Sequence, residues 1–170
     1  MTGIDGALLM LRLWLGAVMI AHGVNHARSL SGTASWFASK GFRRADLNAR
    51  ASALGEIAVG TGLSLGVLTT PAAAGLVTTM TVAFGSIHRF AGFFVFRRPD
   101  EGWEYVASLA VTALAIAILG PGSASIDAFI GVDDLLAGWN GLVIALAGIG
   151  VGGAQLAVFW RRPQKEDAGR

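Results

Sequence analysis

Long apolar stretches separated by short polar segments run through the whole chain. A helix needs about 20 mainly apolar residues to cross a bilayer, and five stretches reach or approach that length. They cover residues 5–27, 51–70, 72–95, 103–120 and 138–160. Only Thr69-Thr70-Pro71 separates the second stretch from the third, which predicts a tight hairpin. The pattern predicts an all-α polytopic membrane protein, with a four-helix transmembrane bundle and a fifth, C-terminal transmembrane helix.

A shorter segment, residues 31–42, follows the first stretch and is typical of an interfacial helix. Ser31 or Thr33 would begin it and Gly41 would end it. Its aromatic residues would lie among the lipid headgroups, with two arginines reaching anionic lipid: Trp36, Phe37, Phe42, Arg43 and Arg44. The alternative is a loop that packs on the bundle.

Composition agrees with a lipid environment. The chain is 54% hydrophobic and only 14% charged, whereas a soluble domain carries roughly 25% charged residues. It contains no Cys, which excludes disulfides, thiolate catalysis and cysteine-bound iron–sulfur clusters from this chain alone. The first residues, MTGID, lack the basic region of a cleaved signal, so we expect the first apolar stretch to be retained as a span.

The basic residues predict the orientation in the membrane. All of the 13 Lys and Arg residues except Arg12 fall in the segments 28–50, 89–102 and 161–170, which five spans would place on one side. Positive charge favours the cytoplasmic side, so we expect the N-terminus outside and the C-terminus in the cytoplasm of a bacterial cell membrane. This sorting also explains the high isoelectric point by lipid headgroups, so we expect membrane lipids and no nucleic acid as partners.

The first span carries polar groups on one helical stripe, which includes Arg12, His22 and His26. Such groups are tolerated in a membrane only where they face protein or water. Arg12 lies toward the outer face, and its expected partner is Asp127 in the outer loop. A structural ion pair between them would hold that loop over the bundle.

Four spans contribute ionisable or polar groups to the cytoplasmic half of the membrane. These residues are His22, Asn25, His26, Glu56, His88 and Glu104. Because each lies on a stripe of small or polar residues, we expect the stripes to face one another around a polar ligand-binding pocket. The pocket could exchange protons beside a quinone, hold a metal or haem, or bind a polar headgroup. Alternatively, the His and Glu side chains only satisfy one another and stabilise the bundle.

The fifth span is rich in glycine, and Gly148 and Gly152 form a small-xxx-small pair. It could pack tightly on its own bundle, or it could provide a surface for another subunit or for a second copy in a homo-oligomer.

Several stretches together resemble the DoxX family of small bacterial membrane proteins. In the family's order they are LRLWLGAVMIAHGVNH, GTASWFASKGF, LGEIAVGTGLSLGVLTTPAA, IHRFAGFF, GWEYVASLA and LGPGSASID. The resemblance implies a DoxX-like four-span bundle over residues 1–127, which leaves an extra span at 128–160 and a polar cytoplasmic tail at 161–170. DoxX-like proteins are similar to the membrane subunit of archaeal thiosulfate:quinone oxidoreductase, and mycobacterial relatives are associated with a membrane oxidoreductase assembly.

The resemblance therefore implies an accessory or quinone-interacting subunit of a redox complex, with other subunits of that complex as partners. The sequence leaves the cofactor and any catalytic residue open, and a quinone is the candidate ligand for the predicted pocket. Two alternatives remain: a non-enzymatic scaffold that docks partners through the fifth span, and a small-molecule permease.

Overall fold

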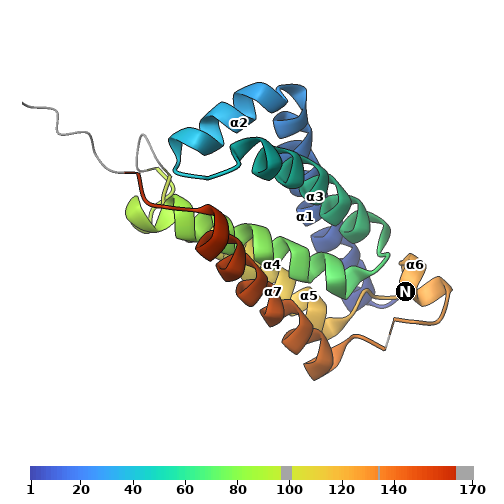
Figure 1. Cartoon of the computed structure of the whole chain (residues 1–170). Helices are drawn as coiled ribbons and strands as arrows, with labels where there is room; N and C mark the ends of the chain where they lie inside the picture. The colour runs from blue at the N-terminus through green and yellow to red at the C-terminus, as the bar shows by residue number, and fades with distance from the viewer. Residues whose placement is uncertain (97–100, 134, 164–170) are drawn as a thin grey trace, which may run out of the picture.

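The computed structural model describes residues 1–96, 101–133 and 135–163, so parts of the predicted basic loop 89–102 and of the tail 161–170 lie outside the described residues. The long helices are α1 (Gly3–Arg28), α3 (Ala45–Leu65), α4 (Thr69–Ser86), α5 (Glu104–Leu119) and α7 (Gly138–Phe159) (Figure 1). The short ones are α2 (Leu30–Ser39), the 3₁₀ turn η1 (His88–Phe90) and α6 (Ile126–Phe129). The predicted all-α class is confirmed for the described residues.

The second long helix begins and ends earlier than the predicted stretch 51–70. Asp46 lies in its first turn, where a carboxylate interacts favourably with the helix dipole. The helix ends at Leu65 because Gly66 adopts a φ of +64° and turns its N–H back to the carbonyl of Gly62. The hairpin turn is therefore 66–68, and Pro71 lies inside the first turn of α4.

The third long helix is shorter than the predicted stretch 72–95. The N–H of Ile87 still donates to the carbonyl of Ala83 at 3.1 Å, and the chain then leaves the helix through η1. Gly92, with a φ of +92°, lies in the loop that follows. His88 is thus on the single turn beyond α4 and not on the helix itself.

The helices form two halves. In the first half α1 packs along α3, and α2 lies against α3; in the second half α4 contacts both α5 and α7. The pairing within the first half depends on glycine, because a Cβ on Gly16 would lie 2.7 Å from the carbonyl oxygen of Gly60. A Cβ on Gly23 would likewise lie 2.8 Å from the carbonyl oxygen of Ala53. Two helices can approach this closely only where side chains are absent.

The glycine pair of the fifth predicted span serves the same purpose in the second half. Gly148 and Gly152 are buried, and added Cβ atoms would lie 2.4 Å from the carbonyl oxygen of Ala74 and 2.8 Å from that of Thr78. Of the two interpretations of this span, packing on its own bundle is confirmed for these two glycines. They are covered by α4 and are not open to a partner.

Two of the long helices, α1 and α7, are long and apolar enough to cross a membrane by length and composition. Their most apolar windows have mean hydropathies of 1.8 and 2.1, yet only 28% and 17% of those residues are buried within the protein. The core helix of a soluble protein would be mostly buried, so we interpret exposed side chains such as Trp14 and Val143 as lipid-facing. α5 is apolar but only 16 residues long, and the four- or five-span count stays a prediction.

The short helix predicted at 31–42 exists but differs in its details. Its N-cap is Ser29, whose hydroxyl accepts a hydrogen bond from the N–H of Gly32, and not Ser31 or Thr33. Phe37 and Phe42 are buried against the ends of α3 and α7, because their large apolar surfaces are covered there by protein. The expectation that both lie among lipid headgroups is therefore wrong, and the alternative of a segment packed on the bundle applies to them.

Candidate functional site

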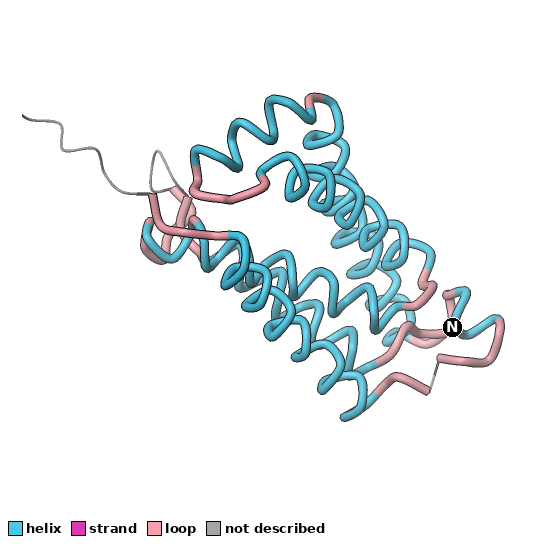
Figure 2. Tube along the Cα trace, in the orientation of Figure 1, coloured by secondary structure: helices cyan, strands magenta, loops and turns pink. Residues whose placement is uncertain are grey.

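A cavity of about 990 Å³ lies between the two halves of the protein. Figure 2 shows the helices of the two halves separating toward the end that carries α2. The walls come from α1, α2 and α3 on one side and from α4, η1, α5 and α7 on the other. Its volume is at the upper end of the range of roughly 300–1,000 Å³ that is common for small-molecule sites.

The same helices form a solid core at one end and the cavity at the other. Along α1, Leu8 and Leu15 belong to the buried core, whereas His22 and His26 line the cavity. Along α5, Ile116 belongs to the core and Tyr105 lines the cavity. We call the end with the cavity the basic end, because it also carries the described arginines at positions 28, 43, 44, 50, 89, 161 and 162.

The structure brings most of the predicted site residues to this cavity. His22, His26, Glu56 and His88 all line it, and Asn25 lies beside them. Glu104 is not among the lining residues. It is the first residue of α5, and its Oε1 accepts a hydrogen bond from the backbone N–H of Val95, in the loop before the helix. Its place on the wall is taken by Glu101 and Tyr105.

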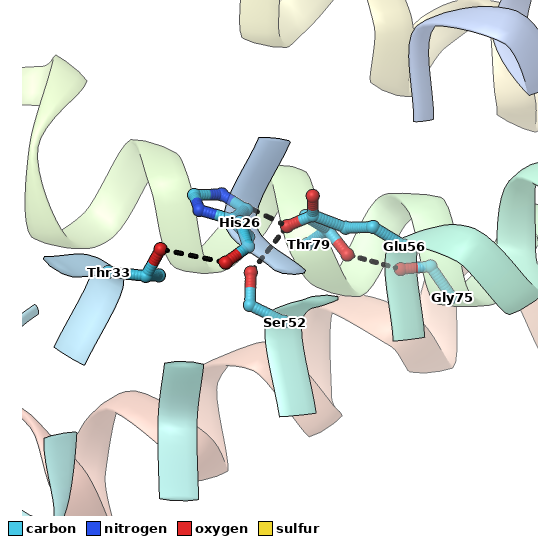
Figure 3. Close-up of polar contacts among 6 residues, drawn as sticks. All are labelled: His26, Thr33, Ser52, Glu56, Gly75 and Thr79. Carbon is cyan, nitrogen blue, oxygen red and sulfur yellow. Dashed lines mark hydrogen bonds and ion pairs between the residues drawn. The ribbon is translucent and has the colours of Figure 1, made fainter. Parts of the chain in front are cut away.

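Glu56 is the most buried ionisable group of the cavity, with 5% of its surface exposed. The hydroxyl of Ser52, one turn earlier on α3, donates to Oε1 of the carboxyl group. Nε2 of His26 lies 3.7 Å from the same oxygen. The other oxygen, Oε2, is buried and has no hydrogen-bond partner. Figure 3 shows it pointing away from Ser52.

His26 is positioned by the turn from α1 into α2. The hydroxyl of Thr33 donates to the backbone carbonyl of His26 at 3.0 Å and folds α2 back over the end of α1 (Figure 3). This brings the rings of Trp36 and Phe37 to within 6.2 Å of the imidazole, measured between ring centroids. The imidazole and carboxyl of the His26–Glu56 pair therefore lie beside an aromatic wall.

The opposite wall, on α4, offers few free polar groups. The hydroxyl of Thr79 donates to the carbonyl of Gly75 on its own helix, as Figure 3 shows. The hydroxyl of Thr78 donates to Ala74 on α4 and to Gly148 on α7. A hydroxyl that donates to its own helix hides most of its polarity from the cavity. On the side of α1 and α3, by contrast, His26 and Glu56 place an imidazole and a carboxyl group side by side on the wall.

His88 is positioned by the loop that joins α4 to α5. Its Nδ1 lies 2.6 Å from the carbonyl oxygen of Glu101, so this ring nitrogen carries the proton that makes the bond. Among the described residues, no three His, Asp or Glu side chains are arranged to hold a metal ion. The described part of the chain thus provides no third ligand for the pair His22 and His26.

The end opposite the cavity is closed by a second polar cluster, which we call the latch: Arg12, residues 66–69 and residues 121–127. Arg12 is 1% exposed and donates to the carbonyls of Pro121 at 2.7 Å and Ala124 at 2.6 Å. Asp127 accepts from the N–H of Leu68, at 2.9 Å, and from the N–H and hydroxyl of Thr69, at 2.9 and 2.7 Å.

Arg12 holds the loop 121–127 as expected, but the predicted ion pair with Asp127 is not a direct contact among the described residues. Each charged group binds backbone instead, because the two loop ends offer unpaired carbonyls and N–H groups at that point. Gly66 makes this arrangement possible, since a Cβ there would lie 2.2 Å from the guanidinium of Arg12.

The sequence interpretation missed a second closure, at the basic end. Residues 159–161, here called the strap, run beside residues 40–43: the N–H of Arg43 donates to Phe159, and that of Arg161 donates to Gly41. Nearby, the amide of Gln155 on α7 donates to Asn48 on α3 at 3.1 Å. The strap and this amide pair connect the two halves beside the cavity. The signal in the sequence is Gln155, a polar residue in the apolar stretch that follows Asn140.

Taken together, long apolar helices with exposed apolar side chains around an internal cavity are typical of a helical membrane protein. The model of the DoxX family matches residues 7–89, so the resemblance to DoxX-family membrane proteins is confirmed over this segment. The matched segment runs from α1 to η1, and α5 and α7 lie beyond it. No curated protein matches the chain. No solved structure matches it either.

Proposed function

We propose that the protein is a quinone-interacting, accessory subunit of a membrane oxidoreductase assembly and that it holds the quinone in the cavity between its two halves. The observation that carries the proposal is a large cavity in which the His26–Glu56 pair lies beside the aromatic wall of Trp36 and Phe37. A quinone has the matching shape, since it combines a planar ring bearing two polar oxygens with a long apolar tail.

The remaining walls suit an apolar tail. Val59 on α3, Met80 on α4 and Leu109 on α5 all face the cavity. Apolar walls with a few convergent polar groups are the usual design of small-molecule sites, where burial provides affinity and the polar groups fix orientation. We place the basic end on the cytoplasmic side of a bacterial cell membrane, with the N-terminus outside, because positive charge favours that side.

Electron transfer to or from the quinone would be carried out by another subunit. The chain has no Cys, so it cannot itself relay sulfur or bind an iron–sulfur cluster through thiolates. The protein would bind and orient the quinone, while a partner subunit exchanges electrons with it.

No separate observation favours the two other functions. A scaffold that docks its partner through Gly148 and Gly152 would need these glycines exposed, and α4 covers them. A permease would need a polar path through the bundle, whereas the latch end is filled by the apolar core.

The test is direct binding to the purified protein in lipid nanodiscs, with decylubiquinone as the probe. Gly55→Phe should abolish binding or weaken it by at least about tenfold, since Gly55 lines the cavity and has open space around its Cα. Gly153→Phe is the matched control, because Gly153 also has open space but lies on α7 away from the cavity. Absence of binding to the wild type, or equal loss in both variants, would contradict the proposal.

A further inference from the structure

A group of arginine and aromatic side chains lies outside the cavity, at the surface of the basic end. We propose that this group, here called the arginine–aromatic cluster, binds the headgroup phosphate of an anionic phospholipid. Its members are Arg89, Phe90, Trp160 and Arg162. None of them lines the cavity, so this second site does not depend on the binding of a quinone.

The strap brings the cluster together from two distant parts of the chain. Arg89 and Phe90 lie on η1, whereas Trp160 belongs to the strap and Arg162 follows it. Figure 1 shows the end of α7 and the turn after α4 at the same end of the protein. The indole N–H of Trp160 donates to the carbonyl of Lys40 at 2.8 Å, and its ring stacks on that of Phe90, with 6.3 Å between the centroids. The two rings thus form a platform at the surface.

Both arginines of the cluster converge on the ring of Phe90. Cζ of Arg89 lies 4.6 Å from the ring centroid, and Cζ of Arg162 lies 4.7 Å from it. The two positive charges are therefore within about 10 Å of each other, roughly one Debye length at 0.1 M salt, and they repel each other. The face of a ring attracts a cation but carries no net charge to offset this repulsion. A bound anion would offset it.

The hydrogen-bond donors of these two arginines are available to such an anion. Both side chains are exposed, and in the described part of the chain neither has a carboxylate partner. A guanidinium group that stacks on a ring through its face keeps its N–H groups at the edge, where they match the oxygens of a phosphate. Arg161, between them and the end of α7, differs: its Nη1 donates to the carbonyls of Ala157 and Trp160.

The surroundings of the cluster favour a lipid as the carrier of the phosphate. Trp160 directly follows the apolar helix α7, and tryptophan is enriched where such helices reach the membrane surface. The loop after η1 also exposes Phe93, Phe94 and Phe96. Exposed phenyl rings beside arginines suit the boundary between acyl chains and headgroups. Two guanidinium groups should select an anionic lipid over phosphatidylcholine, whose choline group balances the charge of its phosphate.

The experiment measures by native mass spectrometry how dioctanoyl-phosphatidylglycerol and dioctanoyl-phosphatidylcholine bind to the full-length protein in a neutral detergent. The wild type should bind the anionic lipid at least about tenfold more tightly. Arg89→Gln combined with Arg162→Gln should bring the two affinities to within about threefold of each other. Phe90→Leu keeps both charges but removes the ring on which they converge, so it should reduce the preference by about threefold or more.

The matched control is Arg28→Gln combined with Arg50→Gln, which removes two exposed arginines from the same end and should keep the preference. Equal binding of the two lipids by the wild type would overturn the proposal. Equal loss of the preference in both double variants would also overturn it, because general charge attraction would then explain the binding.

Two further results bear on the kind of site. Excess inorganic phosphate should leave the anionic lipid bound, and its displacement would mean that the cluster binds soluble phosphate and not a lipid. Should the variant that lacks both arginines of the cluster not fold, Phe90→Leu decides, since Phe90 is an exposed side chain on a short turn. An unchanged preference in Phe90→Leu overturns the proposal.

Discussion

The latch and the cavity both contain buried charged groups, but they treat them differently. In the latch, Asp127 is 6% exposed and receives three donors, from Leu68 and Thr69. In the cavity, Glu56 is 5% exposed and receives one hydroxyl donor, while Oε2 stays without a partner. The two carboxyl groups are therefore almost equally buried, but both oxygens of Asp127 have hydrogen-bond donors and one oxygen of Glu56 has none.

The difference separates a fully paired carboxyl group from a partly paired one. A buried carboxylate whose oxygens all have donors stabilises the fold and has nothing left to offer. Arg12 also has one unpartnered atom, Nε, but it does not line the cavity, and its terminal nitrogens bind two carbonyls. Burial alone is thus a poor guide to function, and the informative feature is whether the buried polar atoms have hydrogen-bond partners.

The largest effect should come from removing the charge at the centre of the latch. Arg12→Ala leaves the carbonyls of Pro121 and Ala124 without donors and should lower the free energy of unfolding by about 3–5 kcal/mol. Thermal unfolding in detergent measures this, with Arg50→Ala, an exposed arginine on α3, as control. If Arg12→Ala lowers the stability no more than Arg50→Ala does, the contrast between the latch and the cavity is lost.

The next effect tests whether the glycines of the fifth predicted span serve packing on the protein's own bundle or docking of a partner. Gly148→Ala places a methyl group 2.4 Å from the carbonyl oxygen of Ala74, so the free energy of unfolding should fall by about 1–3 kcal/mol. Gly150→Ala, at an open position two residues away, should be neutral or raise it by up to about 1 kcal/mol, because alanine favours the helix. A change in oligomeric state without a change in stability at Gly148 would favour docking instead.

Which features of the structure can be predicted from the sequence depends on whether side chains or backbone groups form them. Helix existence and order follow from apolar length, and the meeting of His22, His26, Glu56 and His88 follows from the cost of polar groups in lipid. The hydrogen-bond partners of Arg12 could not be predicted in this way. They are the backbone carbonyls of Pro121 and Ala124, and every residue type has such a carbonyl.

Helix boundaries explain the remaining differences. Glu101 precedes Glu104 by three residues and lies in the loop before α5, so which of them reaches the cavity depends on where α5 begins. Gly66 could be interpreted from sequence as a packing residue or as a helix end, and only its φ of +64° decides for the second. Such choices depend on the loop geometry, which short-range patterns do not determine.

A third prediction makes the same chemical change, from a carboxyl group to an amide, in both regions. Asp127→Asn loses charge-assisted acceptors for backbone N–H groups and should lower the free energy of unfolding by about 2 kcal/mol. Part of that loss reflects Leu68, whose φ of +49° is unfavourable for leucine and is held in place by Asp127. Glu56→Gln should change the stability by less than about 1 kcal/mol, because a neutral amide costs less to bury than a half-satisfied carboxylate.

Chemical denaturation of the two variants in one detergent measures this pair. Similar losses at both sites would mean that Glu56 is as structural as Asp127, and the cavity would then hold a network that only stabilises the bundle. A loss confined to Asp127 keeps the distinction between the regions.

The smallest effect concerns the amide pair that joins the halves beside the cavity. Gln155→Leu removes the hydrogen bond to Asn48 and should lower the free energy of unfolding by about 1 kcal/mol, since Asn48 keeps its bonds to the carbonyls of Arg43 and Arg44. The larger consequence should be for the ligand. Gln155 is a wall residue, so freeing α7 from α3 should speed the dissociation of decylubiquinone while the unfolding midpoint hardly moves. Stopped-flow dissociation rates measure this, with Asn140→Leu, an exposed position at the other end of α7, as control. An unchanged rate would mean that the strap alone holds the halves together, and that the amide pair adds nothing to retention.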